Sequence, residues 1–298
     1  MAKLKELNPA WINISTLMPQ SKTDHITRQF RELPYGEHAL QKLDIYLPEQ
    51  GEGPFPVIVN VHGGGFTHCD KHDFHLYPTM FALQQGFAVA SVNYRLSPEV
   101  KYPEHYFDLM RALLWIKRNG RTYSLDEGKV CLWGTSAGGN LVLQAACREG
   151  IPLPANFQEA RELPIRAVAA MCPAIDIFAS SKDGALLDRL LFRLLIRNLY
   201  QDVFGVKPVT EQAARQSNPS TFIGNGIAPV YLQQGTGDPA VAYAVVKAFG
   251  DRLAKILPPA DYVFHTLEGA PHAGADKTYF LPENVNPIFD FFKSHLPG

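Results

Sequence analysis

The stretch Leu132-Trp133-Gly134-Thr135-Ser136-Ala137-Gly138-Gly139-Asn140 carries the pattern Gly-x-Ser-x-Gly. It lies between an apolar run typical of a strand, Lys129–Trp133, and a run typical of a helix, Asn140–Cys147. In this strand–turn–helix context the pattern predicts a strained turn that exposes the Ser136 hydroxyl at the carboxyl end of a sheet. The two glycines of the pattern have no Cβ, so the strand and the helix can approach closely. We therefore predict that Ser136 is a nucleophile, the alternative being an ordinary serine in a glycine-rich turn.

A second glycine motif, His62-Gly63-Gly64-Gly65-Phe66, directly follows the strand-like run Pro56–Val61. Three successive glycines allow backbone N–H groups to point into an open site, where such donors stabilise the oxyanion of a tetrahedral intermediate. We expect the oxyanion donors to be the N–H groups of Gly64, Gly65 and Ala137. The histidine of the motif is expected to hold the loop by hydrogen bonds. The alternative is a flexible loop without a chemical role.

Strand-like and helix-like runs alternate along the chain. Continuously apolar runs predict strands covered on both faces, at Pro56–Val61, Phe87–Tyr94, Lys129–Trp133, Arg166–Cys172, Pro229–Gln233 and Tyr262–Leu267. Further runs predict helices, at Glu104–Arg118, Val241–Ile256 and Pro287–Leu296. This alternation predicts a mainly parallel central sheet with right-handed crossovers and helices on both faces. The alternating run Leu40–Leu47 predicts a half-exposed antiparallel strand at the edge of that sheet.

A third block reads Asn93-Tyr94-Arg95-Leu96-Ser97-Pro98-Glu99, followed by Tyr102-Pro103 and Asp108. Together with the two glycine motifs it resembles the α/β-hydrolase family, in particular its hormone-sensitive-lipase-like esterases. The small acetyl-xylan and feruloyl esterase-like members are the most similar. The resemblance runs from about Leu43 to the C-terminus, with small departures around this block. It implies an α/β-hydrolase fold in a single domain over residues 1–298, with the chain order serine, acid, histidine.

Two further motifs fit the implied order. Asp238 follows the predicted strand that ends at Gln233, within the pattern Gly-x-x-Asp-Pro, and His272 follows the last predicted strand between small residues. The resemblance implies that Asp238 is the acid and His272 the base of a catalytic triad with Ser136. Asp238 could alternatively be the N-cap of a helix. Asp176, which follows the preceding strand, is the rival acid.

Residues 176–228 interrupt the alternation and predict a helical cap inserted over one end of the sheet. Within this cap, Leu186–Tyr200 places leucines on one helix face and repeats arginine every fourth residue. We expect this helix to pack on its own protein. A basic amphipathic helix can alternatively bind a membrane surface.

Three histidines, His68, His72 and His75, have a spacing that resembles a metal cluster. We interpret them as polar surface or the rim of the site, because zinc sites usually need a fuller set of ligands. We therefore expect no metal and no other cofactor.

The chain has 298 residues and a formal net charge of −1. A near-neutral chain has no bulk field that attracts phosphate backbones, so we expect no nucleic-acid partner. No run approaches the ~20 apolar residues of a membrane span, and the start does not resemble a secretion signal. We therefore expect a cytoplasmic protein without stable membrane insertion. The four cysteines lack CxxC spacing and are predicted to be free, buried thiols: Cys69, Cys131, Cys147 and Cys172.

These motifs predict a serine carboxylesterase that hydrolyses small or short-acyl esters through an acyl-enzyme intermediate. With an unperturbed histidine as base, kcat/KM is expected to climb through about pH 6–7. One alternative is an amidase or peptidase on the same triad, for example an arylformamidase-like enzyme. Another is a non-catalytic receptor on this fold, which the retention of all three triad residues disfavours. The acyl chain, the alcohol and the oligomeric state stay open, with a homodimer as one alternative.

Overall fold

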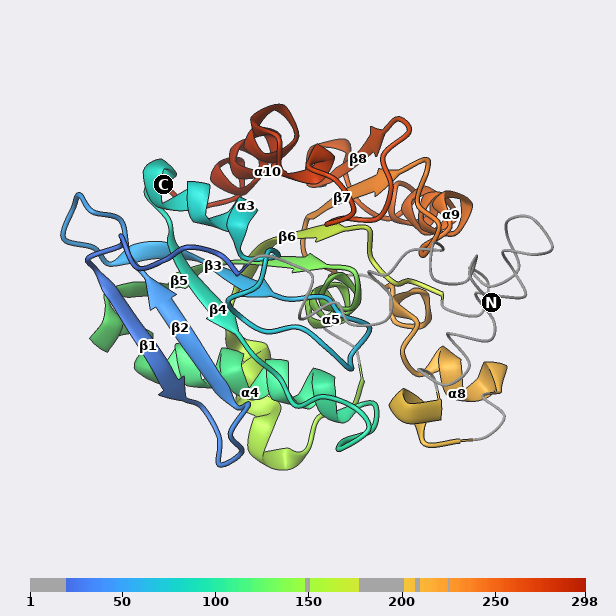
Figure 1. The fold of residues 1–298 in the computed structure, drawn as a ribbon, viewed down its shortest axis with the longest axis horizontal. Coiled ribbons are helices and arrows are strands. Elements are labelled where there is room, and N and C mark those ends of the chain that lie inside the picture. The colour runs from blue at the N-terminus through green and yellow to red at the C-terminus, as the bar shows by residue number, and fades with distance from the viewer. Residues whose placement is uncertain (1–19, 148–150, 177–200, 207–209, 225) are drawn as a thin grey trace, which may run out of the picture.

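A computed structural model describes residues 20–147, 151–176, 201–206, 210–224 and 226–298. In this part of the chain a central sheet of eight strands has the order β1-β2-β4-β3-β5-β6-β7-β8 (Figure 1). The strands are β1 (Gln29–Pro34), β2 (Lys42–Tyr46), β3 (Phe55–Val61), β4 (Ala88–Val92), β5 (Leu125–Thr135), β6 (Ile165–Met171), β7 (Val230–Gly235) and β8 (Tyr262–Leu267). All neighbours from β4 to β8 pair in parallel, whereas β2 is antiparallel to both β1 and β4.

The register of the parallel strands brings their carboxyl ends to one edge of the sheet. Val61 at the end of β3 pairs with Gly134 of β5, and Met171 at the end of β6 pairs with Thr135 of β5. Each of the six runs predicted to be buried strands forms a strand, with ends that shift mostly by one or two residues. The prediction of burial is wrong for β8, which lies at the edge of the sheet and is mostly half-buried. The residues that follow these strands therefore lie together at the carboxyl end of the sheet.

Strand β2 is antiparallel, as predicted, but the prediction that it lies at the sheet edge is wrong. Strand β1 pairs along its outer side. The polar face of β2 is buried there, because the Asp44 carboxylate accepts a hydrogen bond from the Glu32 N–H at 2.7 Å and forms an ion pair with His72. The sequence of β1, QFRELP, contains three polar residues and has no apolar run that would predict a strand.

Helices cover both faces of the sheet. The α-helices are α3 (Tyr77–Met80), α4 (Glu104–Asn119), α5 (Ala137–Ala146), α8 (Glu211–Arg215), α9 (Tyr243–Leu253) and α10 (Pro282–Ser294). Short 3₁₀ helices are η2 (Phe81–Gln85), η3 (Gly120–Tyr123), η4 (Ala155–Glu162), η5 (Pro219–Thr221), η6 (Pro259–Asp261) and η7 (Thr278–Phe280). Figure 1 shows α4 and α10 on opposite sides of the sheet. Among the residues described, no helix has the length and apolar character needed to cross a bilayer.

Alternate residues of the buried strands enter two separate cores. Val57 and Val59 of β3 pack in the core that contains Leu113 of α4. Ile58, between them, packs in the opposite core with Trp133 of β5. Burial on both faces explains why these strands are continuously apolar in sequence.

The predicted cap over residues 176–228 is described only in part, and its helix Leu186–Tyr200 lies outside the described residues. The part that is described is fixed to α5. Asn140 Nδ2 and Gln144 Nε2 donate hydrogen bonds to the carbonyl oxygen of Ser217, at 2.6 and 3.0 Å. Residues 210–221 are thus attached to the helix that follows Ser136.

Candidate active site

Ser136 lies at the sharp turn between β5 and α5. Its backbone has φ 55° and ψ −115°, a conformation that residues with a Cβ rarely adopt. Hydrogen bonds hold it: its N–H donates to the Met171 carbonyl at 2.8 Å, and its carbonyl accepts from the Asn140 N–H at 3.0 Å. A Cβ on Gly138 would lie 2.1 Å from the Val61 carbonyl oxygen, so only glycine lets α5 begin this close to β3. The strained strand–turn–helix geometry predicted from the pattern is present.

Three side chains that follow three different strands form one chain of hydrogen bonds. Ser136 Oγ lies 3.0 Å from His272 Nε2, and His272 Nδ1 lies 2.7 Å from Asp238 Oδ2. The structure thus brings together the three residues that the sequence singled out, although they are more than thirty positions apart. Asp176, the rival acid, accepts a hydrogen bond from Asn218 Nδ2 at 3.0 Å.

The Asp238 side chain is completely buried. Its Oδ1 accepts hydrogen bonds from the N–H groups of Ala240 and Val241, at 2.8 and 2.9 Å. Burial alone would raise the pKa of Asp238, but the neighbouring His272 and these donors lower it below its usual value. The N-cap of α9 is Ala242, so the alternative role of Asp238 as that cap is not observed.

The surroundings of His272 raise its pKa. Burial favours its neutral form, but the Asp238 carboxylate, together with the neighbouring Cys172, outweighs this effect and raises the pKa of His272 well above 6.5. The imidazole therefore accepts a proton at Nε2 more readily than an isolated histidine does.

The glycine loop after β3 packs against the serine turn. Gly64 and Gly65 have φ values of 91° and 60°, and a Cβ on Gly64 would lie 2.2 Å from the His68 carbonyl oxygen. Over the described ranges, the N–H groups of these two glycines donate no hydrogen bond to another protein group. The Ala137 N–H is the first of α5 and has no acceptor within the helix. All three predicted oxyanion donors can therefore bind a further acceptor.

His62 and Tyr94 support this loop from beneath. The two rings stack with centroids 4.3 Å apart, and both are buried. His62 Nδ1 and the Tyr94 hydroxyl each lie 3.0 Å from the Gly63 carbonyl oxygen. Burial lowers the pKa of His62, so its ring stays neutral. The predicted role of His62 in holding the loop is confirmed, and Tyr94 is an addition that the sequence did not indicate.

The three histidines of the apparent metal cluster do not converge. His72 Nδ1 lies 3.0 Å from Asp70, whereas His75 Nδ1 lies 2.8 Å from Asp73. The interpretation of all three as surface or rim residues is wrong for His75, which is buried. Burial opposes ionisation of Asp73, but the adjacent His75 helps to lower the pKa of this carboxyl to about 2. The contact with His75 Nδ1 thus explains how the Asp73 carboxyl is accommodated in the interior.

Cys172 lies at the site without having been assigned a role from the sequence. Its Sγ is 3.9 Å from His272 Nε2. It directly follows β6, the strand between those that precede Ser136 and Asp238, and this position is the signal that could have identified it. All four cysteines are free, as predicted, but Cys69 is only partly buried.

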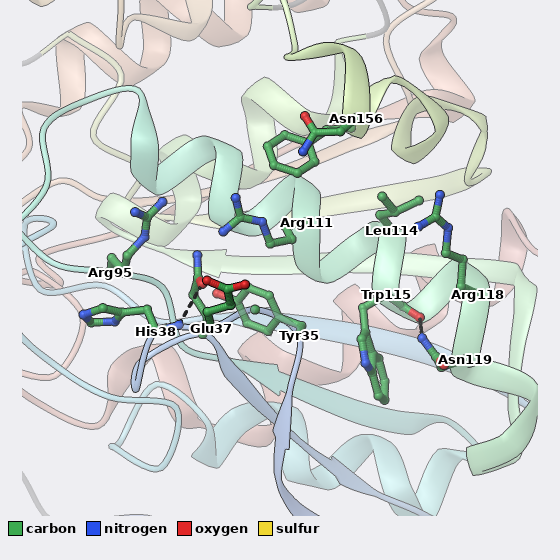
Figure 2. Close-up of a pocket in the computed structure, with 13 residues that line it drawn as sticks. Tyr35, Glu37, His38, Arg95, Arg111, Leu114, Trp115, Arg118, Asn119 and Asn156 are labelled. Carbon is green, nitrogen blue, oxygen red and sulfur yellow. Dashed lines mark hydrogen bonds between the residues drawn. The ribbon is translucent and has the colours of Figure 1, made fainter.

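A cavity of about 900 Å³ lies away from the triad, beside α4 (Figure 2). It is lined by Tyr35, Trp115, Arg111, Asn119 and Asn156, among others. Its arginines are paired within the protein: Arg95 with Asp108 at 2.8 Å, and Arg118 with Glu159. Neither Ser136 nor His272 lines it, so this cavity is separate from the candidate active site.

Known proteins resemble this chain in sequence and in structure. A family model described as BD-FAE matches residues 43–253. Esterase LipQ of Mycobacterium tuberculosis is 27% identical over 249 residues, which cover 82% of this chain and 57% of LipQ. A truncated form of a carbohydrate esterase from gut microbiota has a TM-score of 0.78 at 18% identity, covering 93% of this chain and 99% of that one.

A second solved structure that resembles this chain contains bound butyrate. The esterase Est2 of Thermogutta terrifontis, solved with butyrate bound, has a TM-score of 0.68 at 18% identity and covers 91% of this chain and 95% of that one. The present chain spans 57%, 60% and 61% of the length of three curated relatives that it matches.

Proposed function

The chain belongs to the BD-FAE family and has the α/β-hydrolase fold that its sequence predicts, and we propose that it is a serine hydrolase of carboxylic esters. Its proposed substrates are small or short-acyl esters. One observation carries the proposal: Ser136 Oγ, His272 and the buried Asp238 are joined by contacts of 3.0 and 2.7 Å. This order of groups activates a hydroxyl for attack on a carbonyl carbon.

In the first half of the proposed reaction, His272 Nε2 takes the proton of Ser136 Oγ as this oxygen attacks the ester carbonyl. Asp238 stabilises the resulting imidazolium through Nδ1. The negative oxygen of the tetrahedral intermediate is bound by the three N–H donors described above. His272 then protonates the leaving alcohol, and an acyl-enzyme on Ser136 remains.

In the second half, water replaces the alcohol. His272 removes a proton from this water, which attacks the acyl carbon, and the released Ser136 recovers its proton from the imidazolium. The steps use only groups of this chain and water.

Several observations favour an ester over the alternatives. An alcohol leaves more readily than an amine, so the same set of groups cleaves an ester more easily than an amide. The esterase names of the relatives support an ester substrate, and the butyrate bound to Est2 supports a short acyl group. The carbohydrate esterase among the structural neighbours makes acetylated or feruloylated sugars candidates for the alcohol part. A receptor has no need of aligned Ser136, His272 and Asp238.

The test replaces the nucleophile and labels it. Ser136→Ala should lower ester turnover by ~10⁶, and a fluorophosphonate should label wild-type protein on Ser136 only. Ser294→Ala, at the end of α10, is the matched control and should retain full activity. Turnover above about one per cent in Ser136→Ala would sink the assignment, because losses of a triad serine are far larger. Faster hydrolysis of a p-nitroanilide than of its matched p-nitrophenyl ester would favour the amidase.

A further inference from the structure

A thiol and a hydroxyl approach the same nitrogen at the candidate active site. Cys172 Sγ lies 3.9 Å and Ser136 Oγ 3.0 Å from His272 Nε2. One ligand atom from each of Cys172, Asp238 and His272 lies within 4.8 Å of the other two. Thiolate, imidazole and carboxylate are the groups that Zn²⁺ binds in proteins.

The backbone holds Cys172 in an unusual conformation that puts its thiol there. Its φ is 38°, in the left-handed region that few residues with a Cβ adopt. Its N–H donates to the Gln233 carbonyl at 2.8 Å, which ties it to β7. Such strain is retained where surrounding structure imposes it, and it concentrates at functional sites.

The distances fit a tetrahedral ion. Zn–S and Zn–N bonds of about 2.3 and 2.0–2.1 Å at a tetrahedral angle separate S and N by about 3.5 Å. The observed separation of Cys172 Sγ and His272 Nε2 is 3.9 Å. A Zn–O bond of about 2.0–2.2 Å similarly places O about 3.3 Å from N, compared with 3.0 Å for Ser136 Oγ. Movements of a few tenths of an ångström would bring Sγ and Oγ each to the distance from Nε2 that a shared ion requires.

Asp238 already occupies the supporting position of a zinc site. Metal-binding histidines usually donate their second N–H to a carboxylate, which aims the other nitrogen at the ion. His272 Nδ1 lies 2.7 Å from Asp238 Oδ2, so Nε2, which faces Ser136 Oγ and Cys172 Sγ, is the nitrogen that would bind the ion. A thiolate at Cys172 and the buried carboxylate would together balance the two positive charges.

We propose that Zn²⁺ binds reversibly to Cys172 Sγ and His272 Nε2, with Ser136 Oγ and a water as the remaining ligands, and inhibits the hydrolase. The Cys172 thiol releases its proton to solvent as the Zn–S bond forms, and an imidazolium at His272 likewise releases its Nε2 proton to solvent as the Zn–N bond forms. The Nε2 lone pair is then engaged by the ion and cannot accept the Ser136 proton. Zn²⁺ is here an inhibitor and not a cofactor. The inhibition rests on the proposed function, but the binding of the ion does not.

Two other clusters in the described part of the chain could compete for a metal. In the first, Glu32, Asp44 and His72 lie close together, but Lys71 already forms ion pairs with both carboxylates. In the second, Cys69, Asp73 and His75 lie close together beneath the glycine loop. His75 is buried, and a Cβ on Gly63 would come within 2.8 Å of its Nε2. The experiments therefore need to distinguish the proposed site at Cys172 and His272 only from this second cluster.

The first experiment measures inhibition. Metal-free enzyme is titrated with ZnCl₂ during hydrolysis of p-nitrophenyl acetate, and each variant is compared with its own metal-free rate. Zn²⁺ should inhibit wild type, EDTA should restore the rate, and MgCl₂, which prefers oxygen ligands, should have no effect. Cys172→Ala should raise the half-inhibitory concentration at least about tenfold. Cys147→Ala, which removes a buried thiol elsewhere, should leave it unchanged.

The second experiment needs no catalysis. Co²⁺ bound to a thiolate gives a charge-transfer absorption in the near ultraviolet, which should appear in wild type, in Cys147→Ala and in the inactive Ser136→Ala. It should be absent from Cys172→Ala and from Cys172→Ser, which preserves the shape of the side chain if the alanine variant fails to fold. Co²⁺ absorption together with absent ester turnover would refute the proposed function but not the metal site.

Three outcomes would overturn the metal site. These are equal Zn²⁺ inhibition of wild type and Cys172→Ala, Co²⁺ absorption that persists without Cys172, and absorption that disappears in Cys69→Ala instead. The last would place the ion in the cluster beneath the glycine loop.

Discussion

Nδ1 of His272 lies 2.7 Å from Oδ2 of Asp238, whose side chain has no exposure to solvent. The other carboxylate oxygen accepts two backbone N–H groups, so the position of the carboxylate does not depend on the histidine. A buried carboxylate at this distance favours the tautomer with the proton on Nδ1. The lone pair of Nε2 is then directed at Ser136 Oγ, 3.0 Å away.

Asp238→Asn should therefore lower kcat by about 10⁴, because an amide can stabilise the wrong tautomer of His272. The measurement is kcat for a p-nitrophenyl ester at a pH where the wild type is fully active. Asp176→Asn is the matched control, since its carboxylate accepts a hydrogen bond from Asn218, and it should retain most activity. Greater damage from Asp176→Asn would identify that residue as the acid.

The pH profile should reflect the raised pKa of His272. The base acts in its neutral form, and Asp238 keeps the charged form present to higher pH, so the rise of kcat/KM should be centred above the ordinary value of ~6.5. Asp238→Asn removes the negative charge and should move the midpoint to lower pH. Residual activity of this variant is measured from pH 5 to 9. A wild-type midpoint below ~6.5, or one that does not move in Asp238→Asn, contradicts this account.

The strands and the hydrogen-bonded group of Ser136, His272 and Asp238 could be predicted from the sequence for identifiable reasons. Burial on both faces makes runs such as Pro229–Gln233 continuously apolar, and the reactive residues directly follow such runs. The glycines around Ser136 are required by close packing, because a Cβ added at Gly138 would lie only 2.1 Å from a backbone oxygen. The close packing of α5 against β3 therefore explains the glycine in the motif.

Other features depend on partners that are remote in the chain. The burial of Asp44 depends on His72 and on β1, which lacks an apolar pattern. The burial of His75 depends on Asp73, and spacing alone does not distinguish it from an exposed histidine. The contact of Cys172 with His272 spans one hundred positions and arises only from the order of β5, β6, β7 and β8. Patterns along the sequence do not encode these contacts.

Gly138→Ala should reduce both stability and activity. The added Cβ would lie 2.1 Å from the Val61 oxygen and 2.5 Å from the His62 oxygen, both backbone atoms. To remove this clash, α5 must move away from the glycine loop. This movement should lower the free energy of unfolding by about 1–3 kcal/mol. Gly224→Ala is the control, because nothing lies within 4 Å of its added Cβ, and it should change stability by less than about 0.5 kcal/mol. Chemical denaturation and kcat/KM are measured on both, and equal stability of the two variants would contradict this view of the turn.

The last prediction concerns acyl chain length and the predicted cap. The leucine face of Leu186–Tyr200 is proposed to roof the acyl pocket, while the described residues 210–221 are fixed to α5 through Ser217. Each buried methylene contributes ~0.8 kcal/mol to binding until the pocket is full. For p-nitrophenyl esters from acetate to palmitate, kcat/KM should peak at acetate to butyrate and fall beyond about six carbons, since one short helix covers only a few methylenes.

Alanine substitutions in the cap should shift this optimum. Phe192→Ala or Leu195→Ala should move the peak to longer chains by enlarging the pocket and leave acetate turnover within about tenfold, since the triad lies on the sheet. Ile256→Ala, an exposed apolar residue outside the cap, should leave the peak in place. A preference for palmitate, with activation at a lipid surface, would instead indicate that the arginine-bearing helix is a lid that binds membranes.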